Sequence, residues 1–147
     1  MTRSKGQSIV EFAFIAPMLV FMLISIIYVG ITFLDYTQYN NAARDAARDI
    51  SLQTQFENKK KLVDRINKPD PELLKRYATH LTNLYTATWH AALVDDSGSE
   101  TGDKSKAEDV HITINLERDE LPSIFESLHI LPKHLKAIEY KMKLENN

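Results

Sequence analysis

The sequence predicts an α+β protein in which a long N-terminal helix, part transmembrane and part stalk, leads into a small head. The head should contain a three-stranded antiparallel sheet and a short helix. Three observations support this prediction. Residues 12–34 carry no charge, Asp70 and Pro71 form a helix start signal, and three later segments alternate apolar with polar residues.

The uncharged stretch is long enough to cross a bilayer. Its 23 residues, 12–34, would extend about 34 Å as a helix, which exceeds the hydrocarbon core of about 30 Å. Arg3 and Lys5 precede it and Asp35 follows it, so the N-terminus should be cytoplasmic and the head periplasmic or extracellular. We therefore expect a single-pass protein of the cytoplasmic (inner) membrane. Pro17 should kink the helix, because it removes a backbone donor and clashes with the preceding turn.

The helix is predicted to continue to residue 52, because residues 35–52 contain neither proline nor glycine. Within this part, small residues form a stripe at helical spacing: Ala42, Ala43, Ala46 and Ala47. Two interpretations stay open. The stripe packs against a helix of another subunit, since small residues let backbones approach closely, or it packs on the chain's own sheet.

A second helix should follow a basic and weakly periodic segment, residues 53–69, which is predicted to be a linker or a frayed extension of the first helix. Asp70 is a good N-cap, and Pro71 suits the first helical position. The helix that they start has one apolar face, formed by Leu73, Leu74, Tyr77, Leu81 and Leu84.

Period-two alternation predicts the three strands, each with one buried face. They start near Tyr85, Val110 and Ile138, and a short helix is expected between Pro122 and Pro132. The expected organisation is a leader (1–6), a transmembrane and stalk helix (7–52), a linker (53–69) and an exported head (70–147).

The first residues carry a processing motif. Gly6 lies five residues before Glu11 and follows a short basic leader. Residues 5–12 resemble a class III signal, in which a prepilin peptidase cleaves after the glycine and leaves glutamate fifth in the mature chain. The resemblance implies cleavage between Gly6 and Gln7. The alternative is an ordinary signal anchor that is not processed.

The first third of the chain is similar to the TadE-like pseudopilins of the tight-adherence (Tad/Flp) type IV pilus system. The shared pattern is Gly6, then Glu11 and Phe12, an early Pro17, and the alanine–arginine run over residues 41–48. TadF-like relatives share much of this pattern, so the subtype stays open. The resemblance implies a minor pseudopilin that is processed by a prepilin peptidase and needed for pilus assembly.

The same resemblance implies partners and a role for two residues. The partners would be membrane lipid, the prepilin peptidase, other pilins and pseudopilins, and the Tad/Flp assembly platform. Glu11 and Phe12 would act in subunit assembly, with the Glu11 carboxylate meeting the free amine of Gln7 on a neighbouring subunit. A charged side chain near a membrane span is costly and usually functional. The alternative for Glu11 is simple solvation in the headgroup region.

No catalytic residue, cofactor or metal site is expected. The chain has no cysteine, and its five histidines lack metal-ligand spacing. The acids of the loop at residues 95–109 do not match the positions of an EF-hand: Asp95, Asp96, Glu100 and Asp103. A net charge of −2 does not suggest a nucleic-acid partner. The alternative function is a single-pass membrane-anchored binding module whose head captures a partner outside the cell membrane.

Overall fold

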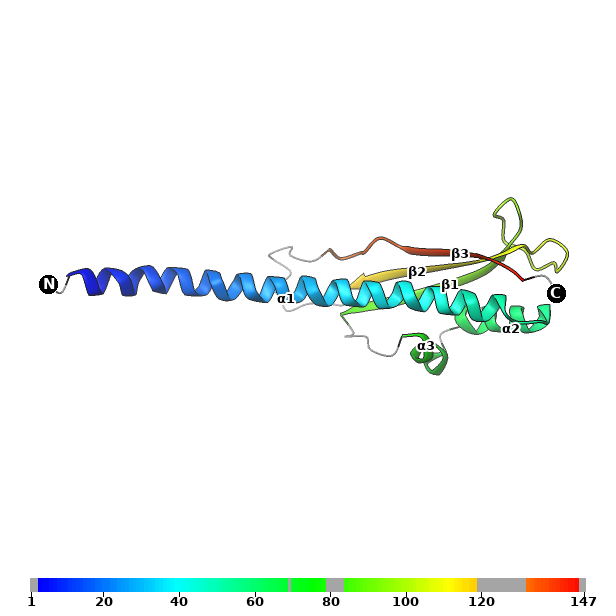
Figure 1. Cartoon of the computed structure of the whole chain (residues 1–147), viewed down its shortest axis with the longest axis horizontal. Coiled ribbons are helices and arrows are strands. Elements are labelled where there is room, and N and C mark those ends of the chain that lie inside the picture. Colours follow the sequence, from blue (N-terminus) through cyan, green and yellow to red (C-terminus); the bar gives the residue numbers. More distant parts are fainter. Residues whose placement is uncertain (1–2, 69, 79–83, 119–131, 146–147) are drawn as a thin grey trace.

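The computed structural model describes residues 3–68, 70–78, 84–118 and 132–145. It shows a long helix with a small head beside its C-terminal part (Figure 1). The elements are α1 (Arg3–Ser51), α2 (Phe56–Asn67), α3 (Pro71–Tyr77), β1 (Tyr85–Val94), β2 (Asp109–Arg118) and β3 (Ile138–Lys143). The predicted α+β fold is confirmed. The short helix expected before Pro132 lies outside the described residues.

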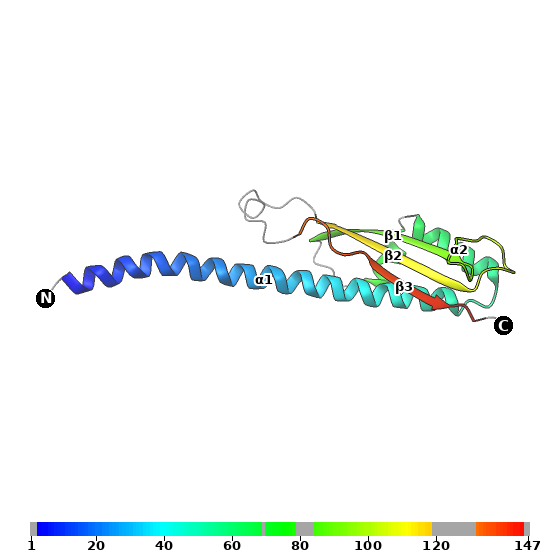
Figure 2. The same ribbon diagram turned by 90° about the horizontal axis from the view of Figure 1, so that it is seen from above.

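The first helix is a single element. α1 has 49 residues, which corresponds to about 73 Å of helix. It continues through Pro17 without a break, and Figure 2 shows it curving gently along its N-terminal half. The kink at Pro17 therefore stays a prediction.

The three strands form an antiparallel sheet in the order β1-β2-β3. The alternation in the sequence sets its two faces. On β2, Val110, Ile112 and Ile114 are fully buried, whereas the side chains between them are only half-buried. α1 lies along β2 and β3 on the buried face, and α2 packs on β1 (Figure 2).

The C-terminal third of α1 belongs to the hydrophobic core of the head. Tyr39 and Ile50 mark the two ends of its buried hydrophobic face, and four alanines lie between them. The core cluster joins this face to α2, α3 and all three strands. The expected boundary between a stalk ending at residue 52 and a head starting at residue 70 is therefore not a boundary of the core.

The interpretation of residues 53–69 as a linker or frayed helix end is corrected by α2. This helix buries Val63 and Ile66 and, unexpectedly, Lys59, which is only 5% exposed. The Lys59 Nζ donates a hydrogen bond to the carbonyl oxygen of Glu145 at 3.1 Å. Burial lowers the pKa of Lys59, and the Glu145 carboxylate partly offsets this effect. A lysine with a long apolar stem thus occupies a core-facing position that appears polar in the sequence.

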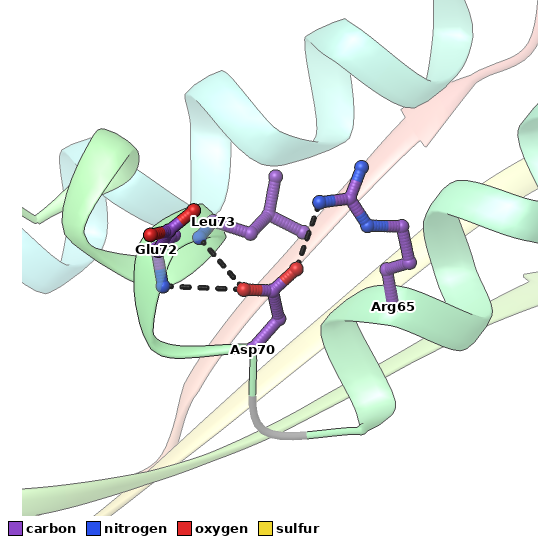
Figure 3. A network of polar contacts seen from close by, with 4 residues as sticks. All are labelled: Arg65, Asp70, Glu72 and Leu73. Carbon is purple, nitrogen blue, oxygen red and sulfur yellow. Dashed lines mark hydrogen bonds and ion pairs between the residues drawn. The ribbon is translucent and has the colours of Figure 1, made fainter.

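The helix start at Asp70 is confirmed (Figure 3). One oxygen of the Asp70 carboxylate accepts hydrogen bonds from the backbone N–H groups of Glu72 and Leu73. The other lies 2.7 Å from the guanidinium of Arg65 on α2. These bonds, the one from Arg65 first, hold the pKa of Asp70 below its ordinary value. α3 ends at Tyr77, earlier than predicted, and Leu81 lies outside the described residues.

Candidate membrane and assembly site

The N-terminal candidate residues lie on the end of α1 that projects beyond the head (Figure 2). Gly6 and Gln7 are within the first turns of the helix, which begins at Arg3. Glu11 follows Gln7 by four residues, so the two positions share one side of the helix, about 6 Å apart along its axis. An amine created at Gln7 by cleavage would lie within one turn of the Glu11 carboxylate of the same chain.

Glu11 and Phe12 stand on an exposed part of α1. Phe12 is 70% exposed, and the Glu11 side chain is also exposed. A carboxylate next to lipid-facing side chains is expensive unless a positive group or water meets it. A positively charged group would therefore be attracted to this position more strongly than to an acid on the head surface.

The N-terminal half of α1 has the surface of a membrane span. Among the described residues, one helix is long and apolar enough to cross a membrane, and its most apolar part is not buried in the protein. Large exposed apolar side chains follow one another from Ile9 to Leu34. Apolar surface of this extent is not stable in water and indicates contact with lipid or with other apolar helices.

The alanine stripe lies elsewhere and faces the protein's own sheet. Ala42, Ala43, Ala46 and Ala47 are all 0% exposed and belong to the core cluster. Ala42 follows Glu11 by about 46 Å of helix, so the structure does not bring the two candidate regions together. Of the two interpretations of the stripe, the fold favours packing within the chain, because no part of these side chains is left for another subunit.

The helix that carries both regions is also the part of the chain that is similar to a known protein family. Residues 6–48 match the family model described as TadE-like protein. The match identifies a TadE-like segment in the N-terminal part of the chain. Comparison with curated proteins and with solved structures gave no match. The TadE-like segment contains Gly6, Glu11 and Pro17 as well as the alanine stripe, whereas α2, α3 and the sheet lie outside it.

The TadE-like segment meets the base of the head at a cluster of polar residues. Asp35 of α1 is 1% exposed. The Tyr85 hydroxyl lies close to the Thr32 hydroxyl and to the charges of Arg118 and Asp35. Burial raises the pKa of Tyr85, while Thr32 and Arg118 lower it and Asp35 raises it further. The first charged side chain after the span is therefore enclosed by the head.

The acidic residues of the loop at residues 95–109 were the candidate ligands for an ion. In the part of the chain that the structure describes, no group of three or more His, Cys, Asp and Glu side chains could hold a metal ion. Two of these acidic residues accept hydrogen bonds from backbone N–H groups of the same loop. The Asp95 carboxylate accepts from the N–H groups of Ser97 and Ser99, both at 3.0 Å, and Asp103 accepts from the N–H of Ser105 at 3.0 Å. Hydrogen bonds to the serines lower the pKa of both carboxyls.

Sequence reasoning missed the two buried charged residues, Asp35 and Lys59. Asp35 looked like an ordinary flanking charge of a span, and no pattern in the sequence shows that the head covers it. Lys59 could have been found, because Phe56, Lys59, Val63 and Ile66 are spaced as one face of a helix.

Proposed function

We propose that the chain is a minor pseudopilin of a Tad/Flp-type pilus system. It is inserted in the inner membrane by the N-terminal half of α1, with the head exported. A prepilin peptidase removes residues 1–6, and the mature chain takes part in pilus assembly with other pilins and the assembly platform.

The observation that carries this proposal is the extent of the family match. It begins at Gly6 and ends at Arg48, so it contains the proposed cleavage position, the glutamate and the whole apolar span. The exposed apolar surface of α1 agrees with membrane anchoring. The described part of the chain offers no group of side chains that could hold a metal ion.

Cleavage after Gly6 is the first test. The peptide bond between Gly6 and Gln7 lies within a helix, and a peptidase needs an extended substrate. Glycine eases that unwinding, because it costs about 1 kcal/mol in a helix relative to alanine. Gly6→Val should leave the leader on the protein, both by stabilising the helix locally and by filling the pocket for the glycine.

Mass spectrometry of the N-terminus measures the outcome in cells with an active peptidase. Gly30→Val is a matched control on the same helix, since a Cβ added at Gly30 has no neighbouring atom within 4 Å. The wild type and Gly30→Val should begin at Gln7, and Gly6→Val at Met1. A wild-type protein that keeps residues 1–6 would contradict the proposal.

Glu11 is the second test. Glu11→Ala removes the costly charge, so insertion should be unharmed, while the attraction to the amine of Gln7 is lost. We expect normal amounts of processed membrane protein and few or no surface pili. Glu139→Ala, which removes an exposed acid of β3, should leave piliation normal. Normal piliation with Glu11→Ala as the sole copy would refute the assembly role and favour the anchored binding module.

A further inference from the structure

An apolar groove lies where α1 leaves the span and meets the base of the head. One wall is a face of α1, formed by Val29, Thr32, Phe33 and Tyr36, and the other is formed by Pro132, Leu135 and Lys136. The groove has a volume of about 370 Å³, within the range of small-molecule sites. The Thr32 hydroxyl donates to the carbonyl oxygen of Tyr28 at 3.0 Å, so this hydroxyl is already paired within the helix.

Hydrogen bonds to the sheet hold the second wall in place. The Tyr85 hydroxyl donates to the carbonyl oxygen of Pro132 at 3.3 Å. The N–H of Arg118 donates to the carbonyl oxygen of Lys133 at 2.8 Å, and the N–H of Leu135 donates to that of Leu116 at 3.2 Å. The groove is therefore preformed between two fixed elements, which lowers the entropic cost of binding.

The position of the groove relative to the membrane follows from the number of residues that cross the hydrocarbon core. If the hydrocarbon core begins at Phe12, about 20 residues cross its roughly 30 Å, and the core ends near Ile31. Val29 then lies at the level of the acyl chains and Tyr36 at the level of the headgroups. The groove opens across the boundary between these two layers, and its α1 wall is continuous with the lipid-facing surface.

The rim of the groove is basic. Lys133 and Lys136 are both exposed. The Lys133 Nζ is 3.9 Å from a carboxylate oxygen of the exposed Glu117, a contact of little strength in water. At the headgroup level these two ammonium groups complement an anionic phosphate.

We propose that this groove binds one anionic phospholipid of the leaflet on the side of the head. An acyl chain lies against Val29, Phe33 and Leu135, and Lys136 contacts the phosphate with Lys133 nearby. The inference rests on the membrane anchoring proposed above. The bound lipid seats the base of the head on the membrane surface, next to the buried Asp35.

Lipid binding is measured on the full chain in mild detergent by native mass spectrometry. One molecule of phosphatidylglycerol should stay bound, and phosphatidylcholine should bind about fivefold more weakly, the effect of one lysine near an anionic headgroup. Lys136→Gln should abolish this preference. Leu135→Glu should remove the adduct, whereas Leu52→Glu, at an exposed leucine just after the C-terminal end of α1, should keep it.

If Leu135→Glu lowers the melting temperature, Pro132→Glu carries the same test, because Pro132 is exposed and lines the same groove. Absence of a phosphatidylglycerol adduct on the wild type overturns the proposal. So does equal binding of the two lipids, or an adduct that survives both groove substitutions.

Quenching of tryptophan fluorescence by phosphatidylglycerol that is brominated on its acyl chains tests, in vesicles, whether the groove contacts lipid. The wild type has one tryptophan, Trp89, which is buried in the head and should be quenched little. Pro132→Trp and Val20→Trp should both be quenched, and Leu52→Trp should not. If the fluorescence of Val20→Trp is quenched and that of Pro132→Trp is not, the proposed lipid site is wrong and the membrane anchor stands. Failure to quench Val20→Trp would instead contradict the anchor itself.

Discussion

Deleting the C-terminal third of α1 should unfold the head, although the deleted residues form a separate stalk in the sequence-based division. Two fragments make the comparison: residues 35–147, which keep the buried face of α1, and residues 53–147, which lack it. We expect the first to unfold cooperatively and the second to have no folded state in water.

The loss of stability can be estimated from the side chains of α1 that are buried in the head. The methyl groups of four alanines, each 0% exposed, contribute about 0.8 kcal/mol apiece, or about 3 kcal/mol together. Burial of Tyr39 and Ile50 adds about 2 kcal/mol each, which gives about 7 kcal/mol. A domain is stable by only about 5–15 kcal/mol. The shorter fragment would also expose Val110 and Ile112, so its net stability should be negative.

Circular dichroism and tryptophan emission during urea titration measure the outcome. Trp89 suits the purpose, because its ring packs edge-on to that of Tyr39 with centroids 6.5 Å apart. A cooperative transition in residues 53–147, with a midpoint close to that of residues 35–147, would refute the reasoning.

The same packing of α1 on the sheet can be tested in the full chain with a single substitution. Ala46→Leu overpacks the core and should cost about 1–3 kcal/mol, whereas Asp45→Leu, at the exposed neighbouring position, should cost little.

Three further substitutions test contacts between the elements of the head. Tyr77 donates to the Asp49 carboxylate at 3.0 Å, and burial followed by this bond raises the pKa of Tyr77 above 10.0. The folded state therefore keeps a proton that the unfolded state loses above about pH 10. Stability should fall as pH rises from that value, and Tyr77→Phe should make the fall in the urea midpoint shallower. The Asn67 amide bonds the N–H and carbonyl of Ala91 on the edge strand β1 at 2.7 and 2.8 Å, so Asn67→Ala should lower the free energy of unfolding by about 1 kcal/mol, read from the same titration. Asp70→Ala should cost about 1 kcal/mol through loss of the helix cap, and an unchanged thermal midpoint would contradict the cap's contribution.

The sequence was sufficient where a structure depends on local periodicity. The β2 strand could be predicted with its buried face because Val110, Ile112 and Ile114 alternate with polar residues. The start of α3 could be predicted because Asp70 supplies its own cap. Both features need information from only a few neighbouring residues.

The sequence was insufficient where the partner of a surface had to be known. The alanine stripe shows helical spacing, but spacing does not distinguish the chain's own sheet from another subunit. In the same way, Asp35 is buried by a head whose nearest strand starts 50 residues later, at Tyr85. The candidate site at the N-terminus, in contrast, could be predicted without knowing a packing partner. Gly6 and Glu11 were identified from a local motif, and their position on the projecting end of α1 adds geometry to that motif.

The two halves of α1 now have different contacts available to them. The small-residue face of its C-terminal third packs against the sheet, so a neighbouring subunit would contact the polar face there. That face lines a groove of about 580 Å³ with Arg44, Arg48 and Glu145 among its residues, and contacts between such charges weaken as salt screens them. The N-terminal half exposes apolar side chains and one carboxylate, Glu11. Exchange of lipid for protein at this half would change little apolar exposure to water. In the proposed assembly, attraction of Glu11 for a positive group would therefore give the contact a direction that apolar packing alone does not.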